Sequence, residues 1–456
     1  MTSPARASLA LAVLRQGLPL ALGMASHATF NLVDLILVGR LGEAAVAGVH
    51  AASTINFLPM VLGNGLSIAT ISLIARHLGA GRLAEAQALS SRSQKWMLLA
   101  GGVIGGLGAV LAVPSIDLLG VEGEGRAIGI HYLVVAQLAS ITMFALMQTT
   151  ATMRARGEGM VPALLLIGAN VLNVALDLVF LFGWDALGIP AFGAPGVAYA
   201  SALARLVAAA IGYWWISRPD YPLRLRWRDD ATAAGGARLG DVAALGVPPA
   251  AQMLVRTIAV LALTRIAAEL GGQEAVTALG VTTRLDTLVL FAALGFASAG
   301  TALVGQQVGA GKPERARAAC RWSALFAFAF SVVLVAGFAL GARPLVALFV
   351  DGASERALAA GELYLTVAAL GQPFAAFGIA VTGGVNGSGR FVPPMLIDLV
   401  GYLGVLLPAV GITAWLAGPD GLAAVWWAFA LGNVAVALGY HLYLERGPWA
   451  GAQLTD

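Results

Sequence analysis

The sequence has few of the residues on which soluble enzymes and metalloproteins depend. Only 11% of its 456 residues are charged, it has 1 cysteine, and its 5 histidines are scattered along the chain. The single cysteine, Cys320, excludes an internal disulfide and a cysteine-ligated metal centre. No His-Glu-x-x-His pattern, Gly-x-Ser-x-Gly elbow or Walker-type phosphate loop is found. We therefore expect no enzymatic activity, no cofactor and no nucleic-acid partner, so that any work must be driven by an ion gradient or a separate subunit.

Apolar residues are abundant instead. They make up 59% of the chain, and the mean hydropathy is +0.83, which leaves too little polar surface for a soluble globule of this length. The 57 glycines show no three-residue period, so they indicate close helix packing and loops rather than collagen. The apolar runs are too long, and alternate too little, for a barrel. The sequence therefore predicts an all-α polytopic membrane protein.

Twelve segments are long enough to span a bilayer, which needs roughly 20 apolar residues. The predicted spans are 14–39, 51–75, 95–120, 128–153, 161–183, 194–217, 241–267, 278–304, 320–349, 357–384, 393–417 and 421–444.

An internal repeat divides these spans into two sets of six. The segment 78–82 returns 230 positions later as 308–312, and Gly157-Glu158-Gly159 has a counterpart at Gly387-Ser388-Gly389. Paired membrane halves are a common transporter design, with the site between or within the halves. We predict two pseudo-symmetric six-helix lobes, residues 1–217 and 241–456, joined by a cytoplasmic linker at 218–240.

The basic residues predict the orientation in the membrane. Each loop is numbered by the predicted span that it follows. Both termini and the even-numbered loops hold most of the 27 lysines and arginines, whereas the odd-numbered loops are richer in acids. Positive charge favours the cytoplasmic side, so both termini are expected there. An amino-terminal signal peptide is disfavoured because the first apolar run continues to Gly39 and the repeat needs a first helix. We expect a monomer in a bacterial inner membrane. The basic residues of the odd-numbered loops are Arg40, Arg126, Arg265, Arg343 and Arg356.

Two predicted spans carry polar stripes. In the first span, His27, Asn31 and Asp34 follow a three-and-seven spacing that puts them on one helical face. In the fifth span, Asn170, Asn173 and Asp177 repeat this spacing. Charges in the middle of a bilayer are costly and mark functional sites by default. Each stripe ends in one aspartate, and both stripes lie in the amino-terminal half.

This pattern is typical of an ion-coupling site. Desolvation, and a second carboxylate nearby, would bring one carboxyl group into the range where it loads and unloads a proton. The same oxygens could hold Na⁺ at Asp34, Asn173 and Asp177. The alternative is that these side chains only hydrogen-bond between packed helices. For His27 the packing role is favoured over proton relay.

Arg256 in the seventh span is another costly charge and needs an acidic partner. Asp286 and Asp398 are the candidates, and the sequence does not choose between them. A buried structural ion pair, or a guanidinium reaching the membrane interface, is favoured over a role in gating or in binding anionic cargo. Three other charged residues are expected near helix ends: Arg205, Arg284 and Glu362.

Apolar and soft side chains are candidates for a cavity that admits varied cargo, because thioethers and aromatic rings adapt to many shapes. Most of them are expected to be ordinary core or lipid-facing residues. The apolar candidates are Met24, Phe30, Phe57, Met60, Met143, Phe144 and Met147, and the polar candidates for the same cavity are His27 and Arg256.

Several motifs together resemble the multidrug and toxic compound extrusion family, MATE, in order and layout across the chain. None is specific alone. The motifs are Pro19, Asn31-Leu32-Val33-Asp34, Val38-Gly39-Arg40-Leu41-Gly42, the segment 66–81, Arg156-Gly157-Glu158-Gly159 before Pro162, Asn173-Val174-Ala175-Leu176-Asp177, and Leu303-Val304-Gly305-Gln306-Gln307.

The resemblance implies a secondary antiporter for amphipathic organic cations that works by alternating access. Where vibrio-type, sodium-coupled members carry a glutamate after Pro248, this chain has Arg256, so it looks more like the DinF branch. That branch implies cation coupling at Asp34, Asn173 and Asp177, with H⁺ favoured over Na⁺, and a bend of the first helix at Pro19. A flippase for a lipid-linked precursor is the alternative, since such proteins share the layout.

Overall fold

The computed structural model describes residues 3–226, 239–349, 355–418 and 421–451. In the first half the helices are α1 (Ser3–Gly39), α2 (Glu43–Gly79), α3 (Leu83–Val110), α4 (Ala112–Leu118), α5 (Gly123–Leu138), α6 (Ser140–Arg156), α7 (Met160–Phe182), the short η1 (Asp185–Leu187) and α8 (Pro195–Ser217). In the second half they are α9 (Leu239–Gly309), α10 (Pro313–Leu340), α11 (Ala342–Phe349), α12 (Glu355–Thr366), η2 (Ala368–Gly371), α13 (Gln372–Gly387), α14 (Val392–Asp398), the π-helical η3 (Leu399–Leu406), α15 (Leu407–Ala417) and α16 (Leu422–Arg446).

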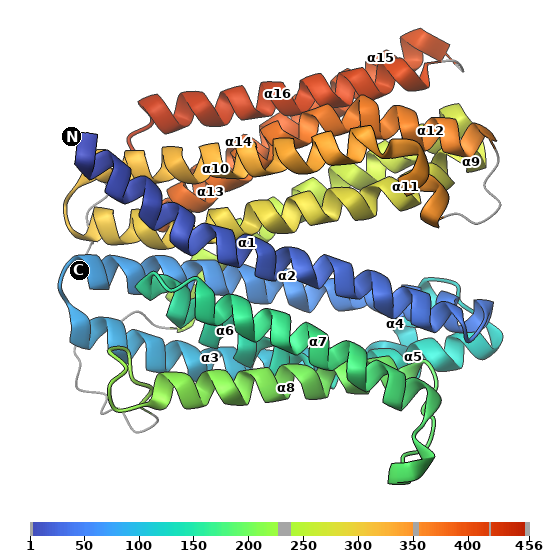
Figure 1. Ribbon diagram of the computed structural model, residues 1–456, viewed down its shortest axis with the longest axis horizontal. Helices are drawn as coiled ribbons and strands as arrows, with labels where there is room; N and C mark the ends of the chain where they lie inside the picture. The colour runs from blue at the N-terminus through green and yellow to red at the C-terminus, as the bar shows by residue number, and fades with distance from the viewer. Residues whose placement is uncertain (1–2, 227–238, 350–354, 419–420, 452–456) are drawn as a thin grey trace. The chain divides into compact units, whose positions relative to one another are not determined.

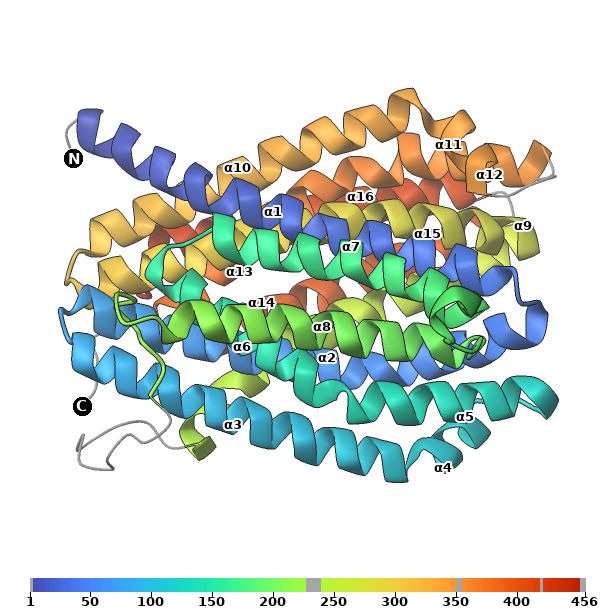
Figure 2. The ribbon, with the colours of Figure 1, turned by 60° about the horizontal axis from the view of Figure 1, so that its bottom comes forward.

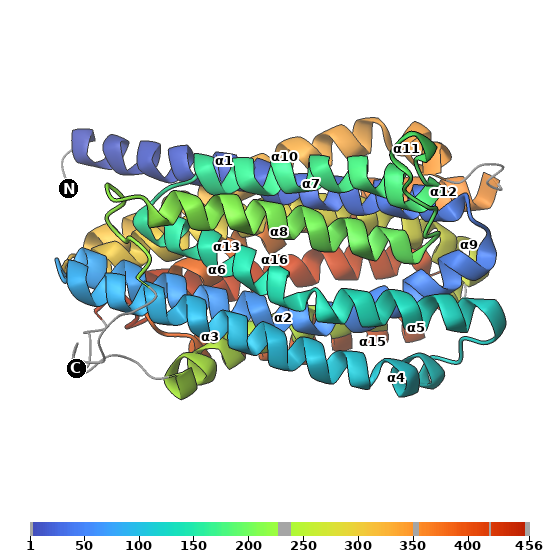
Figure 3. The same cartoon turned by 90° about the horizontal axis from the view of Figure 1, so that it is seen from below.

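The predicted all-α membrane fold is confirmed. Among the described residues, 9 helices are long and apolar enough to cross a membrane, and the bent pairs α3/α4 and α5/α6 raise the number to 11. The remaining predicted span, 241–267, is the first part of α9, which turns at Gly272 with φ 59°. Several spans are interrupted: α4 turns by 60° from the axis of α3 (Figure 3). Hydrophobic length predicts where a span lies but carries no information on such breaks.

The repeated Gly-Ala-Gly segment has the same backbone geometry in both halves. Gly81 and Gly311 have φ of 76° and 68°, a region open to glycine without steric cost. The amide of Arg82 donates to the carbonyl of His77 at 2.9 Å, and that of Lys312 donates to Gln307 at 2.9 Å. The repeat thus encodes one turn, used twice, that ends an apolar helix and starts a basic one. The Gly157 and Gly389 repeats match less closely, since the left-handed glycine is the first of one motif and the last of the other.

The chain forms two contact units. One contains Ser26–Val247, and the other contains Met1–Ala25 and Pro248–Thr455. The unit boundaries differ from the predicted lobe boundaries at α1, whose first residues group with the second half of the chain. Part of the predicted linker, 227–238, lies outside the described residues.

Within the unit Ser26–Val247, glycines allow helices to approach closely. A side chain on Gly48 of α2 would collide with the backbone of Gly125 in α5, and one on Gly105 of α3 would collide with Gln137. Helices α7 and α8 run side by side (Figure 2). Small residues at helix contacts are usual in membrane proteins. Because lipid is itself apolar, there is no hydrophobic driving force between helices, and close packing stabilises their contact instead.

Within the other unit, α10, α13 and α16 lie alongside one another (Figure 1). The end of α13 crosses the second part of α9 through Gly383 and Gly387, whose missing side chains admit the backbone at Ala297 and Thr301. The hydroxyl of Thr301 donates to the carbonyl of Gly383 at 2.9 Å. This contact is a glycine pair four residues apart packed against a neighbouring helix.

Gly387→Ala should destabilise the protein by about 1–3 kcal/mol, because a methyl group has no room beside the Thr301 backbone. The matched control is Gly337→Ala in α10, where nothing lies within 4 Å of the added carbon. Unfolding by sodium dodecyl sulfate in mixed micelles, followed by tryptophan fluorescence, measures both variants. Equal stabilities of the two would show that the crossing tolerates side chains.

Helix α1 is shared between the units. A side chain on Gly295 of α9 would collide with the backbone at Ala21, and one on Gly17 would lie 2.6 Å from the ring of Phe296. These contacts fix the first part of α1 to α9 inside one unit. Pro19 is in the helix interior, and the residues from Ser26 onward belong to the other unit. The predicted bend at Pro19 thus lies between two contacts of α1 with α9, inside the unit that contains Pro248–Thr455.

Candidate functional site

Asp34 of α1 and Asp177 of α7 meet within the unit Ser26–Val247. Their side chains are in hydrogen-bond contact, and Asp177 is 0% exposed. In each carboxyl group Oδ1 is buried and accepts no hydrogen bond from a donor among the described residues. Two ionised carboxylates hold no donor and repel each other, whereas one shared proton supplies the donor and removes one charge. One shared proton would therefore suit both carboxyl groups.

Asn173 holds Asp177 in place from one helical turn away. Its Nδ2 donates to Asp177 Oδ2 at 3.1 Å, and its Oδ1 accepts from the hydroxyl of Ser201 in α8 at 3.4 Å. The amide thus presents N–H rather than oxygen to the carboxylate. For Asn173 to ligate a sodium ion with its oxygen, its amide would have to rotate and lose both hydrogen bonds.

Asn170 of α7 makes a second set of contacts with α1, to Ser26 and His27. Asn170 Nδ2 donates to the hydroxyl of Ser26 at 3.0 Å, and His27 Nδ1 lies 3.4 Å from Asn170 Oδ1. Because that amide oxygen only accepts, His27 must carry its proton on Nδ1 for this bond. The structure thus brings together the predicted residues of both stripes, except Asn31, whose side chain lies outside the described residues together with that of Phe30.

The residues predicted to contact cargo are scattered. Met60 and Met147 pack against a cluster of Met97, Met143 and Phe144 within one unit, as core residues do. Phe57 is half-buried in the same unit, and Met24 belongs to the other. A role of these side chains in binding cargo stays a prediction.

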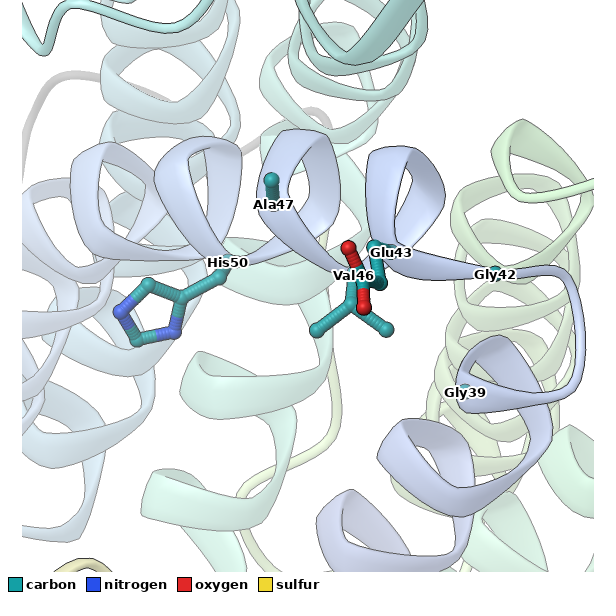
Figure 4. Close-up of a pocket in the computed structure, with 6 residues that line it drawn as sticks. All are labelled: Gly39, Gly42, Glu43, Val46, Ala47 and His50. Carbon is teal, nitrogen blue, oxygen red and sulfur yellow. The ribbon is translucent and has the colours of Figure 1, made fainter. Parts of the chain in front are cut away.

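A pocket of about 400 Å³ opens at the turn between α1 and α2 (Figure 4). None of the residues predicted to contact cargo lines it. Its lining residues are Gly39, Gly42, Glu43, Val46, Ala47 and His50.

The partner of Arg256 is Asp398, which decides between the two candidates. Arg256 Nε and Nη2 donate to Asp398 Oδ2 and Oδ1, each at 3.1 Å, and the hydroxyl of Tyr440 donates to Oδ1 at 2.6 Å. Asp398 is 0% exposed. The other candidate, Asp286, accepts a hydrogen bond from Tyr364. A two-pronged pair with a third donor satisfies most of the carboxylate, as a buried ion pair requires.

Arg205 corrects the sequence analysis, which expected it near a helix end. It lies in the middle of α8 (Pro195–Ser217) and is half-buried. Its electrostatic partners are Asp34 and Tyr132. The predicted span, 194–217, already contained the signal, because residue 205 falls at its centre.

Comparison with known proteins agrees with this architecture. The MatE family model matches residues 19–179 and 248–412. A FAD transporter of Shewanella oneidensis is 24% identical over 413 residues, covering 90% of this chain and 89% of its own. A probable multidrug resistance protein NorM of Rhizobium meliloti is 26% identical over 442 residues, covering 95% and 91%.

Solved structures show the same fold. An outward-facing multidrug resistance MATE family transporter of the MOP superfamily superposes with a TM-score of 0.88 at 24% identity, covering 96% of this chain and 95% of its own. A mutant of the Vibrio cholerae MATE transporter VcmN superposes with a TM-score of 0.87 at 22% identity, covering 97% and 98%. The two matched segments of the family model, one in each half, follow the duplication predicted from the sequence. The resemblance is confirmed: the chain belongs to the MatE family of multi-pass membrane transporters.

Proposed function

We propose that the protein is a secondary multidrug antiporter that exports amphipathic organic cations in exchange for a cation, with H⁺ favoured over Na⁺. One observation carries this proposal: the carboxyl groups of Asp34 and Asp177, from different helices, lie in hydrogen-bond contact inside the bundle. Such a pair can exchange one proton between a charged and a less charged form. The names of relatives such as NorM support drugs as cargo.

In this proposal, helix α1 couples proton binding at the carboxyl pair to a conformational change. Its first part is fixed to α9 at Gly295, while its second part carries Asp34 to Asp177. Pro19, which precedes the contact of Ala21 with Gly295, removes one helical hydrogen bond in the first part of α1, which allows two helix shapes of similar energy. Protonation of the pair shifts the balance between the shapes only if the two bind the proton with different affinity. In this scheme an incoming proton rearranges α1 and releases the drug outward.

The contacts of Arg256 and Arg205 support cationic over anionic cargo. A flippase for a lipid-linked precursor, or a carrier of anions as the name of the Shewanella relative suggests, needs basic groups available to phosphate. Arg256 is engaged on both prongs by Asp398, and Arg205 interacts with Asp34. We further propose a bacterial inner membrane location with both termini cytoplasmic, supported by the distribution of basic residues.

The test is dye movement in proteoliposomes under an imposed pH gradient and, separately, a Na⁺ gradient. We expect a fluorescent organic cation to move against its gradient when protons flow the other way, and not to respond to Na⁺ alone. An anionic flavin nucleotide serves as competitor. Movement of the anion instead of the dye would replace this proposal with the anion-carrier alternative.

A further inference from the structure

The register between α7 and α8 places Arg205 beside this site. The helices are antiparallel: a side chain on Gly196 would lie 2.6 Å from the carbonyl of Phe180, and one on Gly212 would lie 3.4 Å from the side chain of Leu165. Between these points Ser201 bonds Asn173. Arg205 follows Ser201 by one turn on the same face of α8. It therefore lies opposite the part of α7 that contains Asn170.

The electrostatic neighbours agree with this placement. Arg205 acts on Asp34 and Tyr132, and also on His27, which bonds Asn170. The titratable groups around the site are thus two from α1, one each from α5, α7 and α8: His27, Asp34, Tyr132, Asp177 and Arg205.

The charges of this cluster add to a simple result. Two carboxylates and one guanidinium give a net charge of minus one, and one shared proton makes the site neutral. A guanidinium does not lose its proton in proteins, so its charge is permanent. Without Arg205 the ionised site would carry two negative charges and would remain charged after taking up one cation.

We propose that Arg205 is the resident cation of the carboxyl pair, which limits the site to a single proton and excludes Na⁺. This inference rests on the proposed proton-coupled function and names what determines its ion specificity. A metal ion would lie beside a fixed positive charge and facing the N–H of Asn173, which disfavours the wrong ligand by repulsion. A proton bridging two carboxyl groups needs neither space nor a shell of oxygen ligands.

The experiment measures Na⁺ binding without transport. Thermal unfolding of the purified protein in detergent is followed by tryptophan fluorescence in NaCl and in KCl of equal ionic strength. The wild type should unfold at the same temperature in both salts. Arg205→Gln should unfold at a higher temperature in NaCl, with a shift that grows with Na⁺ concentration as ligand linkage requires. Adding Asp34→Asn to that variant should remove the shift, and Arg205→Lys, which keeps the charge, should behave as the wild type.

Two results overturn the inference. One is a Na⁺-specific shift in the wild type that Asp34→Asn removes, which is decisive even if Arg205→Gln does not fold. The other is a folded Arg205→Gln protein with no response to Na⁺. The dye assay separates failure of this inference from failure of the proposed function. If dye moves with the pH gradient while the wild type binds Na⁺, only the inference fails; if Arg205→Gln gains Na⁺ binding but no dye moves, only the proposed function fails.

Discussion

Replacing Asp34 by asparagine should abolish dye efflux driven by a pH gradient. The amide cannot take up or release the proton that the carboxyl pair exchanges, so the ion no longer distinguishes the two states of the carrier. The rate of gradient-driven efflux should fall to that of liposomes without protein. Dye binding to the purified variant should persist, because an asparagine of the same size leaves the surrounding packing unchanged.

The matched control is Asp117→Asn, which neutralises an aspartate that is not part of the pair. Asp117 is solvent-exposed and ion-paired with Arg126 at 2.6 Å. Such surface pairs contribute little, so this variant should transport at the wild-type rate. Normal gradient-driven efflux by Asp34→Asn would contradict the coupling site, and loss in both variants would point to a general effect of charge removal.

Breaking the buried ion pair Arg256–Asp398 should cause a large loss of stability. Arg256→Met leaves the carboxylate of the buried Asp398 with the neutral hydroxyl of Tyr440 as its remaining hydrogen-bond donor among the described residues. Removal of one member of a buried pair costs about 3–5 kcal/mol, because the remaining charge is desolvated without compensation. The double variant Arg256→Met/Asp398→Leu should recover most of this loss. Unfolding by sodium dodecyl sulfate gives the free energies.

Glu269→Gln is the control, because it removes an exposed ion pair instead of a buried one. It breaks the exposed pair Arg265–Glu269, whose atoms are 2.8 Å apart with side chains 78% and 59% exposed, and it should cost about 1 kcal/mol or less. If Arg256→Met is no less stable than Glu269→Gln, the pair is not buried as described. A double variant that is as unstable as Arg256→Met would show that the Arg256 side chain matters through packing rather than charge.

The membrane spans and the polar stripes could be predicted because each depends on a local property. Hydrophobic length predicts a span, and the helical period puts Asn170, Asn173 and Asp177 on one face. The Gly-Ala-Gly turn could be predicted as a repeat because its glycines serve a backbone conformation that other residues disfavour. These features need no knowledge of which helices touch.

Partner choice could not be predicted, because it depends on which helical faces meet. Asp286 and Asp398 were equivalent as partners of Arg256 until the packing of α9 near Asp398 was known. Arg205 is a different case. The predicted span 194–217 nearly coincides with α8 and has Arg205 at its centre, but the register of α7 and α8 is needed to connect Arg205 with Asp34. The breaks at Gly272 and between α3 and α4 are not visible in a hydropathy pattern, which records only the apolar length of a segment.

Proton release on dye binding tests the central claim most directly. Purified protein in weakly buffered detergent solution is mixed with a monovalent dye cation, and a pH indicator reports the protons released at saturation. We expect about one proton for each dye bound by the wild type, since the Asp34–Asp177 pair shares a single proton, and none from Asp34→Asn. Dye binding without proton release in the wild type, or equal release in the variant, would contradict the account.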